Sequence, residues 1–257
     1  MEFLGTSHSW TLHRGVREGR EVFVKRGADF SAEAHGLRRL SPLAPEVVHL
    51  GADELVLPWL EPERPGVRAA EEFGRALAGL HALGADRFGA PWPGMIADLP
   101  LDNAPAGDDW LTWYAERRCL PYARTARDAG TLSASDVTEI EAFLGRARQP
   151  AEPVSRIHGD LWSGNVHWSG GRAWLIDPAA HGGHRETDLA MLGLFGAPHL
   201  DRILAAYDEA RPLAEGWRER APLHRLHPLL VHCVLYGASY RARTMPTARS
   251  SLFSGSG

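Results

Sequence analysis

The fold of this chain is decided by the stretch HGDLWSGN at residues 158–165, which is followed by LIDP at residues 175–178. Together they place Asp160, Asn165 and Asp177 within eighteen positions of one another, with an apolar strand between the last two. Phosphoryl transfer from ATP requires a carboxylate that orients and deprotonates a hydroxyl, and an amide and a second carboxylate that hold Mg²⁺ on the phosphates. The stretch therefore predicts a kinase.

Each of these three residues also has a purely structural interpretation. A Gly-Asp pair at Asp160 is compatible with a plain turn, Asn165 with a turn or a cap, and Asp177 with a cap at a strand end. Their combination favours a site, because Asp160 would leave a short strand and project into a cleft as the catalytic base. Asn165 and Asp177, at the two ends of a predicted hairpin, would offer the hard oxygen ligands that Mg²⁺ prefers.

A lysine suited to phosphate binding lies upstream, at the end of the segment EVFVK. Strand alternation places Lys25 on one face with Phe23, and such a lysine is by default a solvated residue. With the downstream motif present, we expect Lys25 to neutralise the α- and β-phosphates. Glu33, early on the next predicted helix, would hold it, although the helix dipole alone also favours a glutamate there.

The first third of the chain alternates like a small sheet around one helix. Strands are predicted over 10–15, 21–25, 47–50 and 55–57, and the helix over 30–40. PWLEPERPG at residues 58–66 is a proline-rich connector, which makes it the natural domain boundary. We expect residues 1–60 to form an N-terminal nucleotide-binding lobe and residues 61–257 a C-terminal catalytic and substrate-binding lobe.

Helical patterns dominate the rest of the chain. Helices are predicted over 67–83, 109–118, 133–148, 186–195, 200–210 and 224–241, and a hairpin over 166–168 and 173–176. Residues 84–107 are rich in proline and glycine and show little periodicity. A loop of that length in a compact domain usually has a function, such as covering a site.

Composition narrows the class of protein. The hydrophobic fraction of 44% and the charged fraction of 23% are ordinary for a globular protein, and a net charge of −4 gives no electrostatic case for nucleic acid as a partner. No apolar run approaches the roughly 20 residues of a membrane span, and MEFLGTSHSW does not have the pattern of a signal peptide. Cys119 and Cys233 lack a CxxC partner, so we expect buried thiols and a cytoplasmic location.

Other catalytic signatures are missing from the sequence. There is no GxxxxGK[ST], GxGxxG, HExxH, paired CxxC or GxSxG. The stretch AHGGHRETD offers His181, His184 and Asp188 as zinc ligands. Without thiolates or a third well-spaced histidine, zinc is disfavoured.

The blocks HGDLWSGNVHW, LIDPAAHGGHRETDLAM and FGAP resemble the fructosamine kinase (ketosamine-3-kinase) family. This family belongs to the protein-kinase-like superfamily, beside the aminoglycoside phosphotransferases. The most specific part is Trp162 and Ser163 combined with GHRETDLAM at residues 183–191, which aminoglycoside and choline kinases generally lack. The resemblance implies an α+β, bilobal protein-kinase-like fold with a small antiparallel sheet lobe, a mainly helical second lobe, and ATP between them.

The resemblance also implies roles for individual residues. The adenine of ATP would lie against the connector at Pro58, Trp59 and Leu60. The phosphates and Mg²⁺ would be held by Lys25, braced by Glu33, and by Asn165 and Asp177, with Asp160 as the catalytic base. Asp188 and His158 would support the catalytic loop, although Asp188 is also compatible with a plain helix-start carboxylate. Trp162 and His232 would line the sugar side, although a helical histidine is often only a core residue.

The reaction implied is transfer of the γ-phosphate of ATP to the 3-hydroxyl of a ketosamine, a small-molecule adduct of a sugar and an amine. Phosphorylation at that carbon destabilises the adduct and releases the amine, which is a deglycation. The sequence predicts no oligomeric state.

One segment departs from the family pattern. The stretch LGTSHSWT at residues 4–11 aligns with a glycine-rich nucleotide loop but holds one glycine, Gly5. Fewer glycines restrict close approach of the backbone to the phosphates, so Ser7 and its neighbouring hydroxyls would contribute donors instead. A catalytically silent, nucleotide-binding pseudokinase is therefore one alternative, against which the five filled catalytic positions argue. The other is a kinase of the same fold for aminoglycosides or amino alcohols, for which AGDDW at residues 106–110 is a weak acidic signal.

Overall fold

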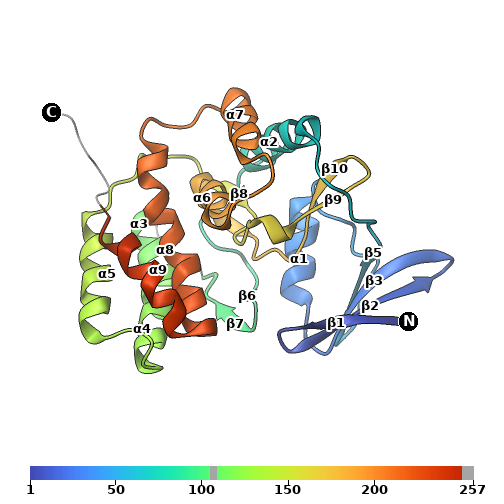
Figure 1. The fold of residues 1–257 in the computed structure, drawn as a ribbon, viewed down its shortest axis with the longest axis horizontal. Helices are drawn as coiled ribbons and strands as arrows, with labels where there is room; N and C mark the ends of the chain where they lie inside the picture. Colours follow the sequence, from blue (N-terminus) through green and yellow to red (C-terminus); the bar gives the residue numbers. More distant parts are fainter. Residues whose placement is uncertain (105–108, 251–257) are drawn as a thin grey trace.

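The computed structural model describes residues 1–104 and 109–250 and divides into a sheet-containing part and a larger, mainly helical part (Figure 1). The sheet has five strands in the order β1-β2-β3-β5-β4, and every neighbouring pair is antiparallel. Their bounds are β1 (Glu2–Ser7), β2 (Trp10–Arg17), β3 (Arg20–Arg26), β4 (His49–Leu50) and β5 (Glu54–Pro58). This confirms the expected antiparallel N-terminal sheet.

The alternation of β3 explains why it forms a central strand. Val22 and Val24 are buried with Val56 of β5 on one face, while Lys25 is buried at the other. The turn to β3 is made by Glu18 and Gly19, whose φ angles of 52° and 76° suit a tight hairpin. The strand β1 was not predicted; residues 4–7 pair with β2 instead of forming an open loop.

The helix α1 (Ser31–Leu40) lies between the sheet and the helices (Figure 1). Its face formed by Ala34, Leu37 and Leu40 is fully buried. The same apolar cluster continues through Leu55 and Leu57 of β5 into the helical part. Because both parts share this cluster, the position of α1 relative to the catalytic loop is fixed by packing.

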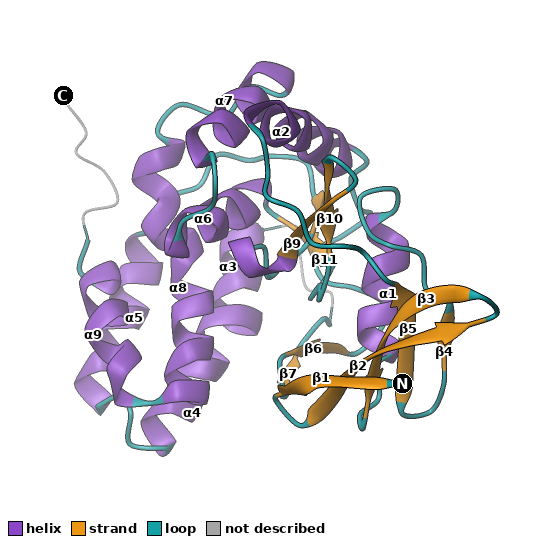
Figure 2. Cartoon of the chain, turned by 45° about the vertical axis from the view of Figure 1, so that its right-hand side comes forward, coloured by secondary structure: helices purple, strands orange, loops and turns teal. Residues whose placement is uncertain are grey.

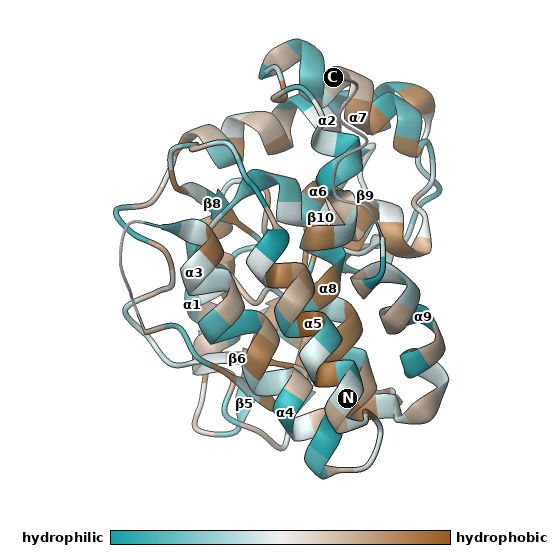
Figure 3. Ribbon diagram, turned by 90° about the vertical axis from the view of Figure 1, so that its left-hand side faces the viewer, coloured by the Kyte–Doolittle hydropathy of each residue, from teal (hydrophilic) through white to brown (hydrophobic). Residues whose placement is uncertain are grey.

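The helical part is built from two groups of helices (Figures 1 and 2). The helices of this part are α2 (Val67–Ala82), α3 (Trp110–Tyr114), α4 (Leu120–Asp128), α5 (Ala134–Arg146), α6 (Arg185–Phe195), α7 (Leu200–Ala210), α8 (Trp217–Tyr236) and α9 (Ala238–Ala248). Helices α2 and α7 pack closely because Gly74 has no side chain: a Cβ there would lie 2.2 Å from the carbonyl oxygen of Ile203. Hydrophobic residues gather on α5 and α8 in the interior (Figure 3).

Three expected elements need correction. The single helix expected over 224–241 is two helices, α8 and α9, because Gly237 takes φ 71° and ψ −148° and interrupts the helix. The helix expected over 109–118 continues through a π-helical turn, Ala115–Cys119, into α4. Residues 84–107 are not one open loop, since they contain a hairpin of β6 (Gly94–Ile96) and β7 (Leu99–Leu101). Part of this stretch, 105–107, lies outside the described residues.

Other expectations are confirmed. The helix expected over 133–148 is α5, which Ser133 caps through a capping box with Asp136, and both cysteines are buried free thiols. The predicted hairpin is β9 (Val166–Ser169) paired with β10 (Arg172–Leu175). Among the helices within residues 1–104 and 109–250, none has the length and apolar character that a membrane crossing requires.

Candidate active site

The loop predicted to be catalytic, residues 158–165, is called the catalytic loop below. It follows β8 (Ser155–Ile157), which pairs with β11 (His181–Gly183). Gly159 enters the loop at φ 83°, and a Cβ there would lie 2.4 Å from the carbonyl oxygen of Ala179, so only glycine fits. The Asn165 amide closes the loop, because its Nδ2 donates to the Asp160 backbone oxygen at 2.8 Å and to Asp160 Oδ2 at 3.1 Å. The loop therefore fixes the Asp160 carboxylate beside the Asn165 amide.

Asp177 follows β10 and reaches the same place from the other side. Its backbone is left-handed, with φ 52°, a conformation that aspartate tolerates better than most residues. Its Oδ1 accepts a hydrogen bond from Lys25 Nζ at 2.7 Å, and 44% of its side chain stays exposed. Asp177 thus combines an ion pair with an open side.

Lys25 of β3 and Glu33 of α1 form the pair expected from the sequence. The Lys25 Nζ donates to both oxygens of Glu33 at 2.9 Å, and the lysine side chain is 3% exposed. Burial alone lowers the pKa of this ammonium, but the carboxylates of Glu33 and Asp177 outweigh it and hold the pKa above its ordinary value. Lys25 is therefore a fixed positive charge.

The site holds more acidic than basic groups. Burial raises the pKa of Glu33 to about 7, against the opposing effect of Lys25. Burial, and then the charge of Asp177, raise the pKa of Asp160 to about 8. Glu33 and Asp177 contact the single ammonium of Lys25, and Asp160 lines the same cavity without pairing with it. A cation placed among these carboxylates would be electrostatically favoured.

Two adjoining cavities meet at this cluster. One, of about 190 Å³, is lined by Ser7, Lys25, Asp160, Trp162, Asn165 and Asp177 together with neighbouring residues. The other, of about 260 Å³, extends from Lys25 and Asp177 to the connector and includes Leu57, Pro58, Trp59, Leu60 and Ile176. Of the residues that we expected to contact the nucleotide, all but one line this second cavity. The exception is Gly5, which lies at a bulge in β1 and lines neither cavity.

A third cavity, of about 110 Å³, opens on the other side of Asp160. Its walls include Trp162, His232 and Tyr236, and His8 and Ala97 from two hairpin turns. Trp162 is 40% exposed, and its ring lies 6.2 Å from that of Phe195 in an edge-to-face arrangement. The structure therefore brings Trp162 and His232 together beside Asp160, as the sequence predicted.

Asp188 and His158 support the loop from behind. The Asp188 carboxylate accepts hydrogen bonds from the backbone N–H groups of His158, at 2.7 Å, and Gly159, at 2.9 Å. His158 Nε2 donates to the Ile176 carbonyl at 2.9 Å, and its Nδ1 accepts from the Asp160 N–H at 3.2 Å. His158 thereby joins the loop that carries Asp160 to the strand that leads to Asp177.

His81 of α2 is a supporting residue that sequence reasoning missed. It is fully buried, its Nε2 lies 3.1 Å from Asp188 Oδ2, and its Nδ1 lies 2.8 Å from the Tyr207 hydroxyl. The available signal was a histidine on the apolar stripe of an amphipathic helix, next to Leu77 and Leu80. His81 connects α2 and α7 to the carboxylate that holds the catalytic loop.

The contact between the two hairpin turns over the site was also missed. The Ser9 hydroxyl, in the β1–β2 turn, donates to Asp98 Oδ1 at 2.8 Å, in the β6–β7 turn. Asp98 Oδ2 also lies 3.7 Å from His8 Nδ1. The two turns lie side by side (Figure 2), so the sheet and the helical part contact each other above the cavities.

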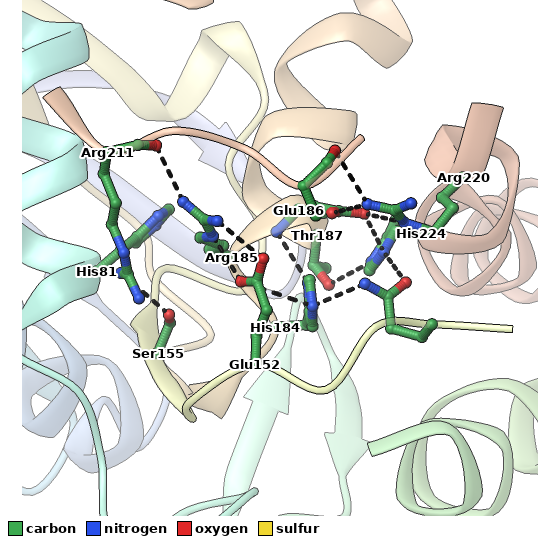
Figure 4. Close-up of polar contacts among 12 residues, drawn as sticks. His81, Glu152, Ser155, His184, Arg185, Glu186, Thr187, Arg211, Arg220 and His224 are labelled. Atoms are coloured by element: carbon green, nitrogen blue, oxygen red, sulfur yellow. Dashed lines mark hydrogen bonds and ion pairs between the residues drawn. The ribbon is translucent and has the colours of Figure 1, made fainter. Parts of the chain in front are cut away.

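The histidine-rich stretch belongs to a separate, buried network (Figure 4). Of the groups that the structure describes, His184, Glu186 and His224 have metal-ligand spacing, with ligand atoms within 4.8 Å of one another. Both Glu186 oxygens already accept from Arg220, at 2.6 and 3.0 Å. His181 and Asp188 are not members of this group, so the zinc set considered from the sequence is not assembled.

Known proteins resemble this chain in sequence and in structure. A family model described as fructosamine kinase matches residues 7–252. A "probable ketoamine kinase" of Enterococcus faecium is 33% identical over 241 residues, covering 90% of this chain and 85% of that one. The crystal structure of a "putative fructosamine-3-kinase" from Thermobifida fusca superimposes with a TM-score of 0.92 at 49% identity, covering 96% of this chain and 91% of the other.

A more distant structure shares the fold alone. An aminoglycoside phosphotransferase solved with ADP and hygromycin B superimposes with a TM-score of 0.65 at 15% identity, covering 99% of this chain and 94% of the other. The bilobal, protein-kinase-like fold expected from the sequence is thereby confirmed.

Proposed function

This chain belongs to the fructosamine kinase family, and from that premise we propose that it transfers the γ-phosphate of ATP to the 3-hydroxyl of a ketosamine. As a member it is a kinase that uses ATP and transfers phosphate to a hydroxyl group; the acceptor and the position on it are the proposal. The observation that carries it is the convergence of Asp160, Asn165 and Asp177 on one cavity opposite Lys25. Release of the amine from the phosphorylated adduct would make the reaction a deglycation.

We place ATP between the sheet and the helical part, with a lobe boundary at residue 60. The apolar cavity beside Pro58, Trp59 and Leu60 suits adenine, and Lys25 at its inner end suits the α- and β-phosphates. Ser7 lines both this cavity and the catalytic one, which suits a hydroxyl donor to a phosphate. Glu33 holds the lysine in place by two hydrogen bonds.

Mg²⁺ fits the donor set on the far side of the lysine. Asp177 offers an exposed carboxylate, and the Asn165 amide oxygen makes no hydrogen bond among the described residues because its Nδ2 is the group that binds Asp160. These are hard oxygen ligands in a site that holds more acidic than basic groups. With Asn165 and Asp177 as its protein ligands, Mg²⁺ would supply positive charge that stabilises the phosphates during transfer.

Asp160 would orient the acceptor hydroxyl and take its proton. Proton transfer is late in a loose transition state, so the position of the carboxylate matters more than its basicity. Asn165 and His158 hold the Asp160 side chain and backbone, and Asp188 holds the loop behind them. This support is the structural argument for a competent enzyme and against the silent pseudokinase.

The acceptor cavity favours a ketosamine over a polycation. Trp162 and His232 offer flat walls for a sugar, and Asp160 is the one carboxylate among the residues that line this cavity in the described chain. An aminoglycoside would require several carboxylates there. Of the acidic signal at residues 106–110, residues 106–108 lie outside the described residues, and Asp109 caps α3 by accepting a hydrogen bond from the Thr112 N–H at 2.9 Å.

A substrate panel tests the proposal. Purified protein with Mg·ATP is expected to phosphorylate synthetic fructosyl-lysine or ribulosyl-lysine, with the phosphate on O3 by NMR, and to leave kanamycin unchanged. The Asp160→Asn variant provides the background rate. Phosphorylation at another carbon, or of kanamycin alone, would contradict the proposed acceptor.

A further inference from the structure

A row of aromatic side chains leads outward from the acceptor cavity. It runs from Trp162 to Phe195, at 6.2 Å between ring centroids, and from Phe195 to His232, at 5.3 Å. It continues from His232 to Tyr240, at 4.6 Å, and to Tyr236, at 5.4 Å, whose side chain is 53% exposed. Because the row begins beside Asp160 and ends at the surface, it can carry the part of an acceptor that projects out of the cavity.

An arginine that has no acidic partner among the described residues lies on this row. The Arg243 guanidinium carbon is 5.2 Å from the Phe195 centroid and 5.8 Å from that of Tyr240. Its neighbours on α9 and beyond are paired, Arg241 with Asp136 at 2.7 Å and Arg249 with Glu139 at 2.6 Å. Within the described chain Arg243 makes no ion pair, and it is exposed. Stacking on two rings limits the orientations of its guanidinium.

The acceptor site therefore has an acidic residue at one end and a basic residue at the other. Asp160 is at the inner end, where the sugar hydroxyl would react, and Arg243 is at the outer end of the aromatic row. A guanidinium presents a fork of donors that matches a carboxylate. The matching acceptor has an uncharged sugar at one end and an anion at the other.

We propose that Arg243 is a specificity-determining residue that binds a free carboxylate on the amine half of the acceptor. This rests on the proposed function, and it deepens it: the preferred substrate class is a glycated free amino acid rather than a glycated lysine within a protein, whose carboxyl group is an amide. The aromatic row contacts the apolar segment between the sugar and the carboxylate, and Arg243 binds that carboxylate.

The test compares two ligands that differ in one group. Nα-acetyl-fructosyl-lysine carries a free carboxylate, and its carboxamide is otherwise identical. Binding of each is measured by calorimetry in the presence of Mg²⁺ and a non-hydrolysable ATP analogue. We expect the acid to bind about threefold to tenfold more tightly than the amide, and the preference to decrease at high salt, as for a partly exposed ion pair.

Variants assign that preference to one side chain. Arg243→Gln is expected to remove it, and Arg243→Lys to retain part of it. Arg218→Gln is the matched control, because Arg218 is also an exposed arginine over an aromatic ring, at 4.4 Å from Trp217, but this ring is not part of the aromatic row. It is expected to leave the preference unchanged.

The outcomes separate this inference from the proposed function. Equal binding of acid and amide, an acid preference that survives in Arg243→Gln, or failure of both ligands to bind would overturn the role of Arg243. Turnover of both ligands at equal efficiency would overturn it and leave the kinase proposal standing. Preferential binding of the acid with no phosphate transfer would support Arg243 and contradict the proposed reaction.

Discussion

Two clusters of charged side chains in this protein differ in their balance. The back network pairs Glu152 with Arg185 and Glu186 with Arg220, so each carboxylate has its own guanidinium (Figure 4). The cleft cluster consists of Lys25, Glu33, Asp160, Asn165 and Asp177, and it holds three carboxyl groups but one ammonium, which pairs with Glu33 and Asp177. A balanced set stabilises the fold by itself, whereas an unbalanced set is completed by a ligand.

The pKa values follow the same division. Burial alone raises the pKa of Glu186, but hydrogen bonds from His224 and Arg220 outweigh it and lower the pKa to about 2. In the cleft, burial prevails and raises the pKa of Glu33 to about 7 and that of Asp160 to about 8. The pKa values of these buried carboxyl groups thus differ because different numbers of cations surround them.

The largest expected effect is loss of activity without loss of stability. Asp160→Asn is expected to lower kcat by about 10²–10⁴-fold, the range of a lost general base. Its thermal midpoint without nucleotide is expected to equal or exceed that of the wild type, because the raised pKa of Asp160 means that folding disfavours its charged form, a cost that the neutral amide removes. Steady-state kinetics and thermal unfolding of the same preparation measure both. A marked fall in the midpoint would show that the cleft cluster is balanced after all.

In the back network, by contrast, a single substitution is expected to lower the stability of the fold. Glu186→Gln leaves the buried Arg220 without its carboxylate and is expected to cost about 3–5 kcal/mol of unfolding free energy at pH 7. The pKa of Glu186 is lowered from 4.5 to about 2, so its stabilisation is present above 4.5 and is lost as the pH falls toward 2. The difference from the wild type, measured by urea unfolding, therefore decreases between pH 5 and pH 3.

Glu139→Gln is the control for this prediction. Glu139 pairs with Arg249 at 2.6 Å but at the surface, so its replacement is expected to change the unfolding free energy far less than Glu186→Gln does. Equal losses in the two variants would mean that burial does not separate the pairs.

The sequence predicted the parts of the cleft cluster that are close along the chain. Asp160, Asn165 and Asp177 are joined by one loop and one hairpin, so their spacing alone indicates convergence. The pairing of Lys25 with Glu33 spans one turn between a strand and a helix. Contact of Lys25 with Asp177, 152 positions away, depends on how α1 and β5 pack on the helical part, which no local pattern records.

The missed elements have similar physical causes. His81 reaches Asp188 across 107 positions, and only the packing of α2 reveals why a histidine stands on an apolar stripe. The strands β6 and β7 are three residues each, too short for alternation to be seen. The helical period passes through Gly237, so the break between α8 and α9 depends on a backbone conformation and not on hydropathy.

His81 connects the two regions in function, and its replacement is expected to have an intermediate effect. His81→Phe keeps a ring but leaves Asp188 with only the two backbone donors. We expect a loss of about 1–3 kcal/mol in stability, typical of a buried acceptor that loses a partner, and a lower kcat with an unchanged KM for ATP. Tyr207→Phe, which removes the hydroxyl beside His81 Nδ1, is the milder control. A change confined to the KM for ATP would contradict a role through the catalytic loop.

The smallest expected effect concerns the Ser9–Asp98 contact, which is exposed and links the two hairpin turns over the cleft. Ser9→Ala removes one hydrogen bond, and a typical net value of about 0.5–1.5 kcal/mol limits the effect to roughly tenfold. Because His8 and Ala97 of the same turns line the acceptor cavity, we expect the KM for the acceptor to rise while the unfolding free energy falls by no more than that value. A larger loss of stability instead would place this contact with the back network, as part of the fold and not of the site.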